Sequence, residues 1–106
     1  MIRVTFFETG DSLTGFECKG HSMAAERGED IVCAAVSSAC LMTANTVTDI
    51  LRLDADAAAT DGFLRLTINA SPASAQDILQ GLRLHLIELA KEYPQNIKVE
   101  VQSCLS

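Results

Sequence analysis

A histidine and a cysteine lie at the two ends of a short segment, where together they could form a nucleophile with its own base. Cys33 follows His21 by 12 positions. In such a pair the imidazole takes the thiol proton, the thiolate attacks a carbonyl carbon, and the imidazolium then protonates the leaving amine. The two residues therefore predict a Cys-His dyad that acts on a peptide bond.

A helix is expected to position the cysteine. Asp30 is a good capping residue, and the chain from there to about Leu51 contains neither Gly nor Pro. Cys33 then falls in the first turn, where the helix dipole favours a thiolate and the free backbone N–H groups, including its own, are candidate donors to an oxyanion. The negative charges of Glu29 and Asp30 oppose the thiolate.

A loop over residues 20–29 is expected to carry the histidine. It has mixed charge, no hydrophobic period, and glycines at Gly20 and Gly28 that would let it fold back onto the helix. Ser37 lies one helical turn after Cys33 on the same face and is a candidate supporting residue. The same residues also fit a purely structural interpretation, with Cys33 as a small core residue and His21 in solvent.

The remaining cysteines and the second histidine fit structural roles better. Cys18 falls within a predicted strand, Cys40 lies two turns after Cys33, and Cys104 is close to the C-terminal end of the sequence. His85 has the spacing of an apolar helical stripe, which favours a packed or boundary residue. The sequence contains no Cys-x-x-Cys pair and no histidine cluster, so neither a metal nor another cofactor is expected.

The elements around this segment predict an α/β (α+β) fold of one domain over residues 1–106. Two hairpins, a helix after each and a final strand give the order ββαββαβ, which is typical of a two-layer sandwich with a mixed sheet and two helices on one face. The predicted strands are residues 2–7, 13–19, 52–59, 63–69 and the stretch around 97–101. The second helix is expected to end near Pro94, and the first has apolar residues on a wide face, which predicts burial on more than one side.

Composition limits the classes of partner. The formal net charge is -6 and the chain has four Phe, one Tyr and no Trp, which disfavours direct binding to nucleic acid. The acidic balance would attract a basic partner, although it also fits a role in solubility alone. The N-terminal residues do not resemble a secretory leader, and the longest apolar stretch is judged too short and too polar to span a bilayer. A cytoplasmic protein with reduced thiols and no membrane contact is therefore expected.

The segment also resembles a known signature. Gly20-His21, a short loop and Asp30-Ile31-Val32-Cys33-Ala34-Ala35-Val36-Ser37 are similar to the motif of the ribosomal-processing cysteine protease family, known as Prp. The resemblance implies a Cys-His endopeptidase that removes a short N-terminal extension from large-subunit ribosomal protein twenty-seven. It also implies His21 as the base, Cys33 as the nucleophile, and a homodimer.

Further implications concern substrate binding. Bulky hydrophobic residues precede the cleavage site in this family, which implies a hydrophobic cleft near Cys33. Residues 22–29 are similar in placement to a loop that opens to admit the peptide, so Gly20, Ser22, Gly28, Asp30 and Ser37 are candidate substrate-binding or supporting residues. The resemblance also implies a basic substrate, which the net negative charge of the chain would attract.

Two other functions remain open from the sequence. A noncatalytic ribosome-associated or assembly factor of the same fold would bind the ribosomal protein without cleaving it. A redox sensor that pairs Cys33 with Cys40 conflicts with helix geometry, because two turns separate their Cα atoms by roughly 10 Å, beyond the reach of a disulfide.

Overall fold

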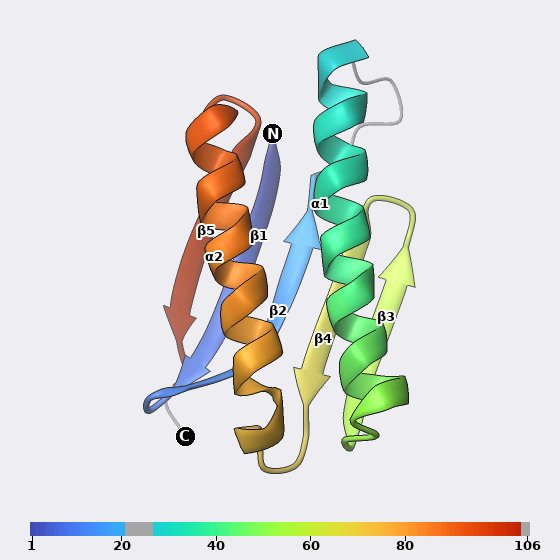
Figure 1. The fold of residues 1–106 in the computed structure, drawn as a ribbon, viewed down its shortest axis with the longest axis vertical. Helices are drawn as coiled ribbons and strands as arrows, with labels where there is room; N and C mark the ends of the chain where they lie inside the picture. Colours follow the sequence, from blue (N-terminus) through green and yellow to red (C-terminus); the bar gives the residue numbers. More distant parts are fainter. Residues whose placement is uncertain (21–26, 105–106) are drawn as a thin grey trace.

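Seven main elements follow the predicted order ββαββαβ (Figure 1). The computed structural model describes residues 1–20 and 27–104. The elements are β1 (Ile2–Thr9), β2 (Ser12–Lys19), α1 (Arg27–Asn45), β3 (Ala55–Thr60), β4 (Phe63–Ile68), α2 (Gln76–Glu92) and β5 (Ile97–Ser103). A π-helical turn, Thr46–Ile50, extends α1, and a short 3₁₀ turn, Ala73–Ala75, precedes α2.

The strands form one mixed sheet in the order β3-β4-β2-β1-β5. The hairpin partners and the β2–β4 pair are antiparallel, whereas β1 and β5 are parallel. The parallel pair arises because the chain leaves β4, passes through α2 and returns at the opposite edge of the sheet (Figure 1). The predicted mixed sheet with two helices on one face is confirmed.

Glycines make both hairpin turns possible. Gly10 and Gly62 have φ angles of 61° and 78°, in the left-handed region that costs other residues energy. The first turn is shorter than predicted, because β1 continues to Thr9 and β2 already starts at Ser12. β3 starts at Ala55, later than the predicted residue 52.

The core lies between the sheet and the two helices. Phe6 and Phe16 pack at its centre with ring centroids 6.0 Å apart. α2 contributes Leu79, Leu82 and Leu86 from the face that its periodicity predicts. A second set of buried residues comes from α1 and its π-helical extension: Val32, Val36, Cys40, Thr43, Ala44 and Val47.

Within a single chain, the first helix is buried on one face only. Its other side carries Ile31, Met42 and Ile50, which are 65%, 54% and 74% exposed. The stretch Ile31–Ile50 has 20 residues and, by length and composition alone, is long and apolar enough to cross a membrane. The expectation that it is too short and too polar is therefore wrong, although a helix that packs into a globular core passes the same test.

Candidate active site

Cys33 lies on α1, half-buried and packed against the hydrophobic core. The helix begins at Arg27, so Cys33 falls in the second turn and not in the first. Asp30 lies inside the helix, and the prediction that it caps the helix is wrong. Gly28 is also helical, where a loop was predicted. A helix tolerates one glycine at a cost of about 1 kcal/mol, and the Arg and Glu beside it are good helix formers.

The earlier helix start changes the electrostatics expected at Cys33. In an α-helix that begins at Arg27, the N–H of Cys33 pairs with the carbonyl four residues before it. It is therefore not a free donor for an oxyanion, as was predicted. The dipole effect also fades beyond the first turn, so it contributes less to a thiolate in the second turn.

Gly20 fixes the point at which the chain leaves the sheet. It follows β2 with a φ of 104°, and a Cβ at this position would clash with the carbonyl oxygen of Met1. A side chain is therefore excluded both by backbone conformation and by space. The next two candidates, His21 and Ser22, lie outside the described residues.

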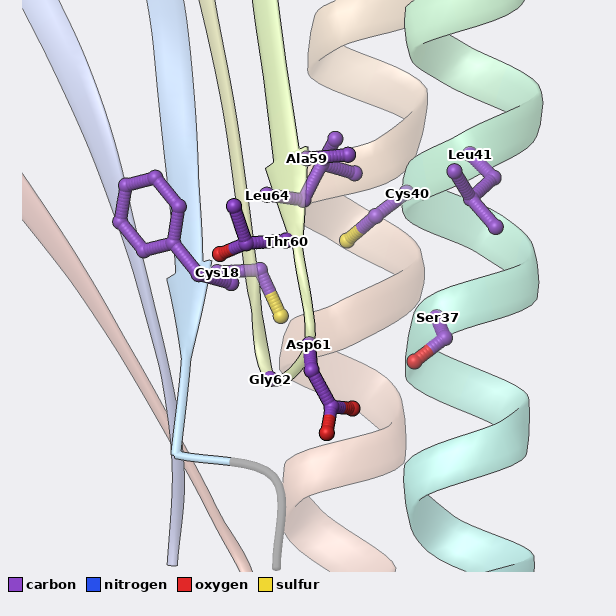
Figure 2. Close-up of a pocket in the computed structure, with 10 residues that line it drawn as sticks. Cys18, Ser37, Cys40, Leu41, Ala59, Thr60, Asp61, Gly62 and Leu64 are labelled. Atoms are coloured by element: carbon purple, nitrogen blue, oxygen red, sulfur yellow. The ribbon is translucent and has the colours of Figure 1, made fainter.

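A cavity of about 320 Å³ begins one turn along α1 from Cys33. It lies between α1, β2 and the turn of the β3–β4 hairpin (Figure 2). Its wall includes Ser37, the candidate supporting residue, together with Cys18, Cys40, Leu41, Ala59, Thr60, Asp61, Gly62, Phe63 and Leu64. The lining is mostly apolar, with two hydroxyls and one carboxylate at its edge, so the cavity suits an apolar group.

Short side chains on β3 explain why this space is open. Ala57 and Ala59 pair with Leu66 and Leu64 on the neighbouring strand, so they project from the same face of the sheet as those core residues. A methyl group at each position reaches less far toward α1 than a larger side chain would. The space left under the helix becomes the cavity.

Two buried thiols meet in the cavity wall, which sequence reasoning missed. Cys18 is 1% and Cys40 0% exposed, and their thiols form a hydrogen bond. Each is predicted to be structural, and both are buried, but from the sequence they are far apart on a strand and a helix. The available signal was periodicity: Cys18 alternates with Phe16 toward the core, and Cys40 follows Val36 by one turn.

Two other candidates lie away from this region. His85 is exposed on α2, so the prediction of a packed or boundary position is wrong. The backbone N–H of Cys104, after β5, donates to the Glu8 carbonyl at 2.7 Å. Within residues 1–20 and 27–104, no group of three or more His, Cys, Asp or Glu residues is arranged to hold a metal ion.

Comparison with protein families decides the class of protein. The model of a family described as cysteine protease Prp matches residues 1–98. The chain belongs to the Prp family of cysteine proteases. The match includes both His21 and Cys33, and it makes the protein an enzyme, contrary to the alternative of a noncatalytic assembly factor. No curated protein matches the chain.

Solved structures of Prp proteins share the fold. A ribosomal processing protease Prp from S. aureus, in complex with a substrate peptide, has 26% identity and a TM-score of 0.83, with 96% of this chain and 100% of that chain covered. The same S. aureus protease with a covalently linked product peptide has 27% identity and a TM-score of 0.80 over the same shares. SMU.848 from Streptococcus mutans, at 24% identity, has a TM-score of 0.81 with 98% and 96% covered, which shows the fold alone.

Proposed function

We propose that this Prp-family protein is an endopeptidase that removes the short N-terminal extension of large-subunit ribosomal protein twenty-seven. The observation that carries the proposal is the family match over residues 1–98. Support comes from the S. aureus relative, a ribosomal processing protease with structures that contain a substrate peptide and a covalently linked product peptide. A covalent link to peptide is what a thiol nucleophile leaves behind when it attacks a carbonyl carbon.

Cys33 is the nucleophile and His21 the general base in this proposal. Cys33 is half-buried, so a peptide can approach its sulfur, whereas Cys18 and Cys40 are almost fully enclosed. His21 follows Gly20 directly, and the backbone of Gly20 lies close to the backbone of Met1 at the end of β2. The segment that carries the base therefore starts at the end of β2. His21 takes the thiol proton and returns it to the leaving amine.

The cavity beside Ser37 is proposed to accept a hydrophobic side chain that precedes the cleaved bond. It starts one helical turn from Cys33, and its apolar lining favours such a group over a charged one. Gly20, Ser22, Gly28, Asp30 and Ser37 support substrate binding or the local backbone. The role of Asp30 is no longer that of a cap, since it lies within α1.

The net charge of -6 would favour encounter with a basic ribosomal protein. Because salt screens this attraction, kcat/KM for the extended ribosomal protein should fall as ionic strength rises. A short neutral peptide that spans the cleavage site is the control and should show little salt dependence. Equal salt dependence for both substrates would contradict the role of charge.

A homodimer in the cytoplasm is the proposed working form, with no cofactor and with neither nucleic acid nor membrane as a direct partner. Ile31, Leu41, Met42 and Ile50 leave apolar side chains exposed along the first helix and its extension. A second copy of the chain could cover part of this surface. Sedimentation analysis of the wild type and of Met42→Lys would test it, since the charge should shift the equilibrium toward monomer if this surface is used.

Cleavage of the extended ribosomal protein is the test of the whole proposal. The purified wild type should shorten the substrate at one bond after hydrophobic residues, as measured by intact mass, and His21→Ala should remove this activity. A substrate that already lacks the extension is the control and should stay unchanged. Binding without any cleavage by the wild type would overturn the proposal.

A further inference from the structure

Two thiols from different elements meet in the wall of the cavity and are not used in the proposed cleavage. Cys18 projects from β2 and Cys40 from α1, and Figure 2 shows the two side chains directed toward each other across the space between sheet and helix. A hydrogen bond joins them. Both residues therefore form one pair, although 22 positions separate them in the sequence.

The fold holds both partners of this pair in place. Cys18 lies in the middle of the sheet, where it pairs with Val4 on β1 and with Leu64 on β4. Cys40 sits in the middle of α1 within the buried face of the helix. Strand and helix are both regular at these positions, so the placement of the two thiols does not depend on a loop.

The cavity gives small molecules narrow access to Cys18. Both residues line a space of about 320 Å³, but solvent-sized molecules touch only 1% of Cys18 and none of Cys40, surface inside the cavity included, so a small molecule meets the pair at Cys18. This volume exceeds the share of liquid volume of one water molecule, roughly 30 Å³, by about tenfold. A hydroperoxide of the size of hydrogen peroxide therefore fits.

The hydrogen bond also makes the two thiols different. The Cys40 thiol donates to Cys18, which lowers the pKa of Cys18, while burial acts in the opposite direction. The pKa of Cys40 is raised above its ordinary value of 9.0, because its proton is held in this bond and because the thiol is buried. Cys18 is thus the better nucleophile of the pair, and Cys40 keeps its proton.

We propose that Cys18 and Cys40 are an oxidation site at which a hydroperoxide converts the two thiols into a disulfide between β2 and α1. The Cys18 sulfur attacks one peroxide oxygen and the O–O bond breaks, which gives a sulfenic acid and one molecule of water. The Cys40 sulfur then attacks the Cys18 sulfur, the S–O bond breaks, and the hydroxyl leaves with the Cys40 proton as a second molecule of water. Two thiols are oxidised and one hydrogen peroxide is reduced.

This site is separate from the proposed cleavage chemistry. Cys33 lies two turns from Cys40 on the same helix, a separation that a disulfide cannot bridge. The bond would fix β2 to α1 at the cavity wall, so the two elements that border the cavity could no longer separate. The structure therefore assigns the pair a chemistry that does not depend on Cys33.

Peptide mapping of a Cys33→Ala variant tests the proposal without reference to cleavage. The folded variant is treated with hydrogen peroxide, unfolded with iodoacetamide present, and digested with trypsin. Cleavage after Arg3, Lys19, Arg27 and Arg52 puts Cys18 in peptide 4–19 and Cys40 in peptide 28–52. We expect these two peptides to appear joined, with a mass lower by two hydrogen atoms than their sum, and to separate on reduction with dithiothreitol.

Variants of the pair and one thiol outside it provide the controls. Cys18→Ala and Cys40→Ala, each combined with Cys33→Ala, should lose the joined peptides, and Cys104→Ala in the same background should retain them. If the replacement of Cys18 or Cys40 prevents folding, the peptide map of the Cys33→Ala protein still tests the proposal, because it shows whether peptides 4–19 and 28–52 are joined. Alkylated Cys18 and Cys40 after treatment that has oxidised Cys104 would overturn the proposal, as would a joined peptide that contains Cys104 in place of either one.

Discussion

Cys33 and Cys40 lie on the same helix, two turns apart, and they face different surroundings. Cys33 is half-buried at the edge of the core, whereas Cys40 is fully enclosed and donates a hydrogen bond to Cys18 while it keeps its proton. A thiol that is buried and keeps its proton is a poor nucleophile toward a peptide. Both residues are cysteines, so the residue type does not distinguish them. What distinguishes Cys33 as the candidate nucleophile from Cys40 is where each lies on α1 relative to the sheet.

The largest expected effect is on cleavage. Cys33→Ala should reduce the rate of cleavage of the extended ribosomal protein by at least on the order of 10³-fold, because no other thiol takes its place. Cys40→Ala is the matched control on the same helix, and its rate should remain within about tenfold of the wild type. Rates are measured from the intact mass of the substrate over time. A larger loss in Cys40→Ala than in Cys33→Ala would reverse the assignment of the two cysteines.

A second effect concerns the end of β2, the strand that also carries Cys18. Gly20→Ala should lower the free energy of unfolding by about 3 kcal/mol, since the left-handed backbone costs 1–2 kcal/mol and the new Cβ must also displace the backbone of Met1. Gly10→Ala is the control, with φ 61° and open space around its Cβ, and should lose only about 1–2 kcal/mol. Urea denaturation measures both. Equal losses would show that the contact with Met1 adds nothing.

A smaller effect distinguishes the two cysteines by stability. Cys40→Ala should lower the free energy of unfolding by about 1–2 kcal/mol, because it opens space in the core and leaves Cys18 without its hydrogen bond. Cys33→Ala should lose about half as much, since its side chain is only half-buried. Chemical denaturation at neutral pH checks the order. A greater loss of stability in Cys33→Ala than in Cys40→Ala would contradict the claim that Cys40 is the more tightly packed of the two thiols.

The smallest effect is a dependence on alkaline pH. The pKa of Cys40 is raised in the folded protein, so above its ordinary value of 9.0 the unfolded chain releases a proton that the folded chain retains. The stability contributed by Cys40 is therefore fully present below pH 9.0 and is lost as pH rises further. Thermal melts between pH 8 and 10.5 should show a steeper decline for the wild type than for the double variant Cys18→Ala, Cys40→Ala, in which neither buried thiol titrates. Parallel curves would contradict the retained proton.

The order of the elements and the type of sheet could be predicted from the sequence, because alternation and turn residues are local signals. The strands 63–69 and 97–101 and the end of α2 before Pro94 follow directly from such signals. The start of α1 could not be placed, because Gly28 resembles a loop residue and Asp30 a cap, whereas the structure continues the helix through both. Local propensity was outweighed there by the rest of a long helix.

Some parts of the candidate site could likewise be predicted from the sequence, and others could not. The motif that contains His21 and Cys33 was visible in the sequence, because its residues lie close together in the chain. The Cys18–Cys40 pair and the cavity were not, because they arise where a strand and a helix meet and where short Ala side chains leave space. Such features depend on contacts between residues that are distant in the sequence, for which a single chain gives no direct signal.

A peptide chloromethyl ketone that ends in a hydrophobic residue tests the central claim most directly, because it alkylates the thiol that acts as the nucleophile. Tryptic peptide 28–52 holds both Cys33 and Cys40, and fragmentation of this peptide assigns the label to one of them. We predict one label per chain, at Cys33, with loss of cleavage in proportion to labelling and no labelling of Cys33→Ala. A label at Cys40 or Cys18, or full cleavage after complete labelling of Cys33, would contradict the account.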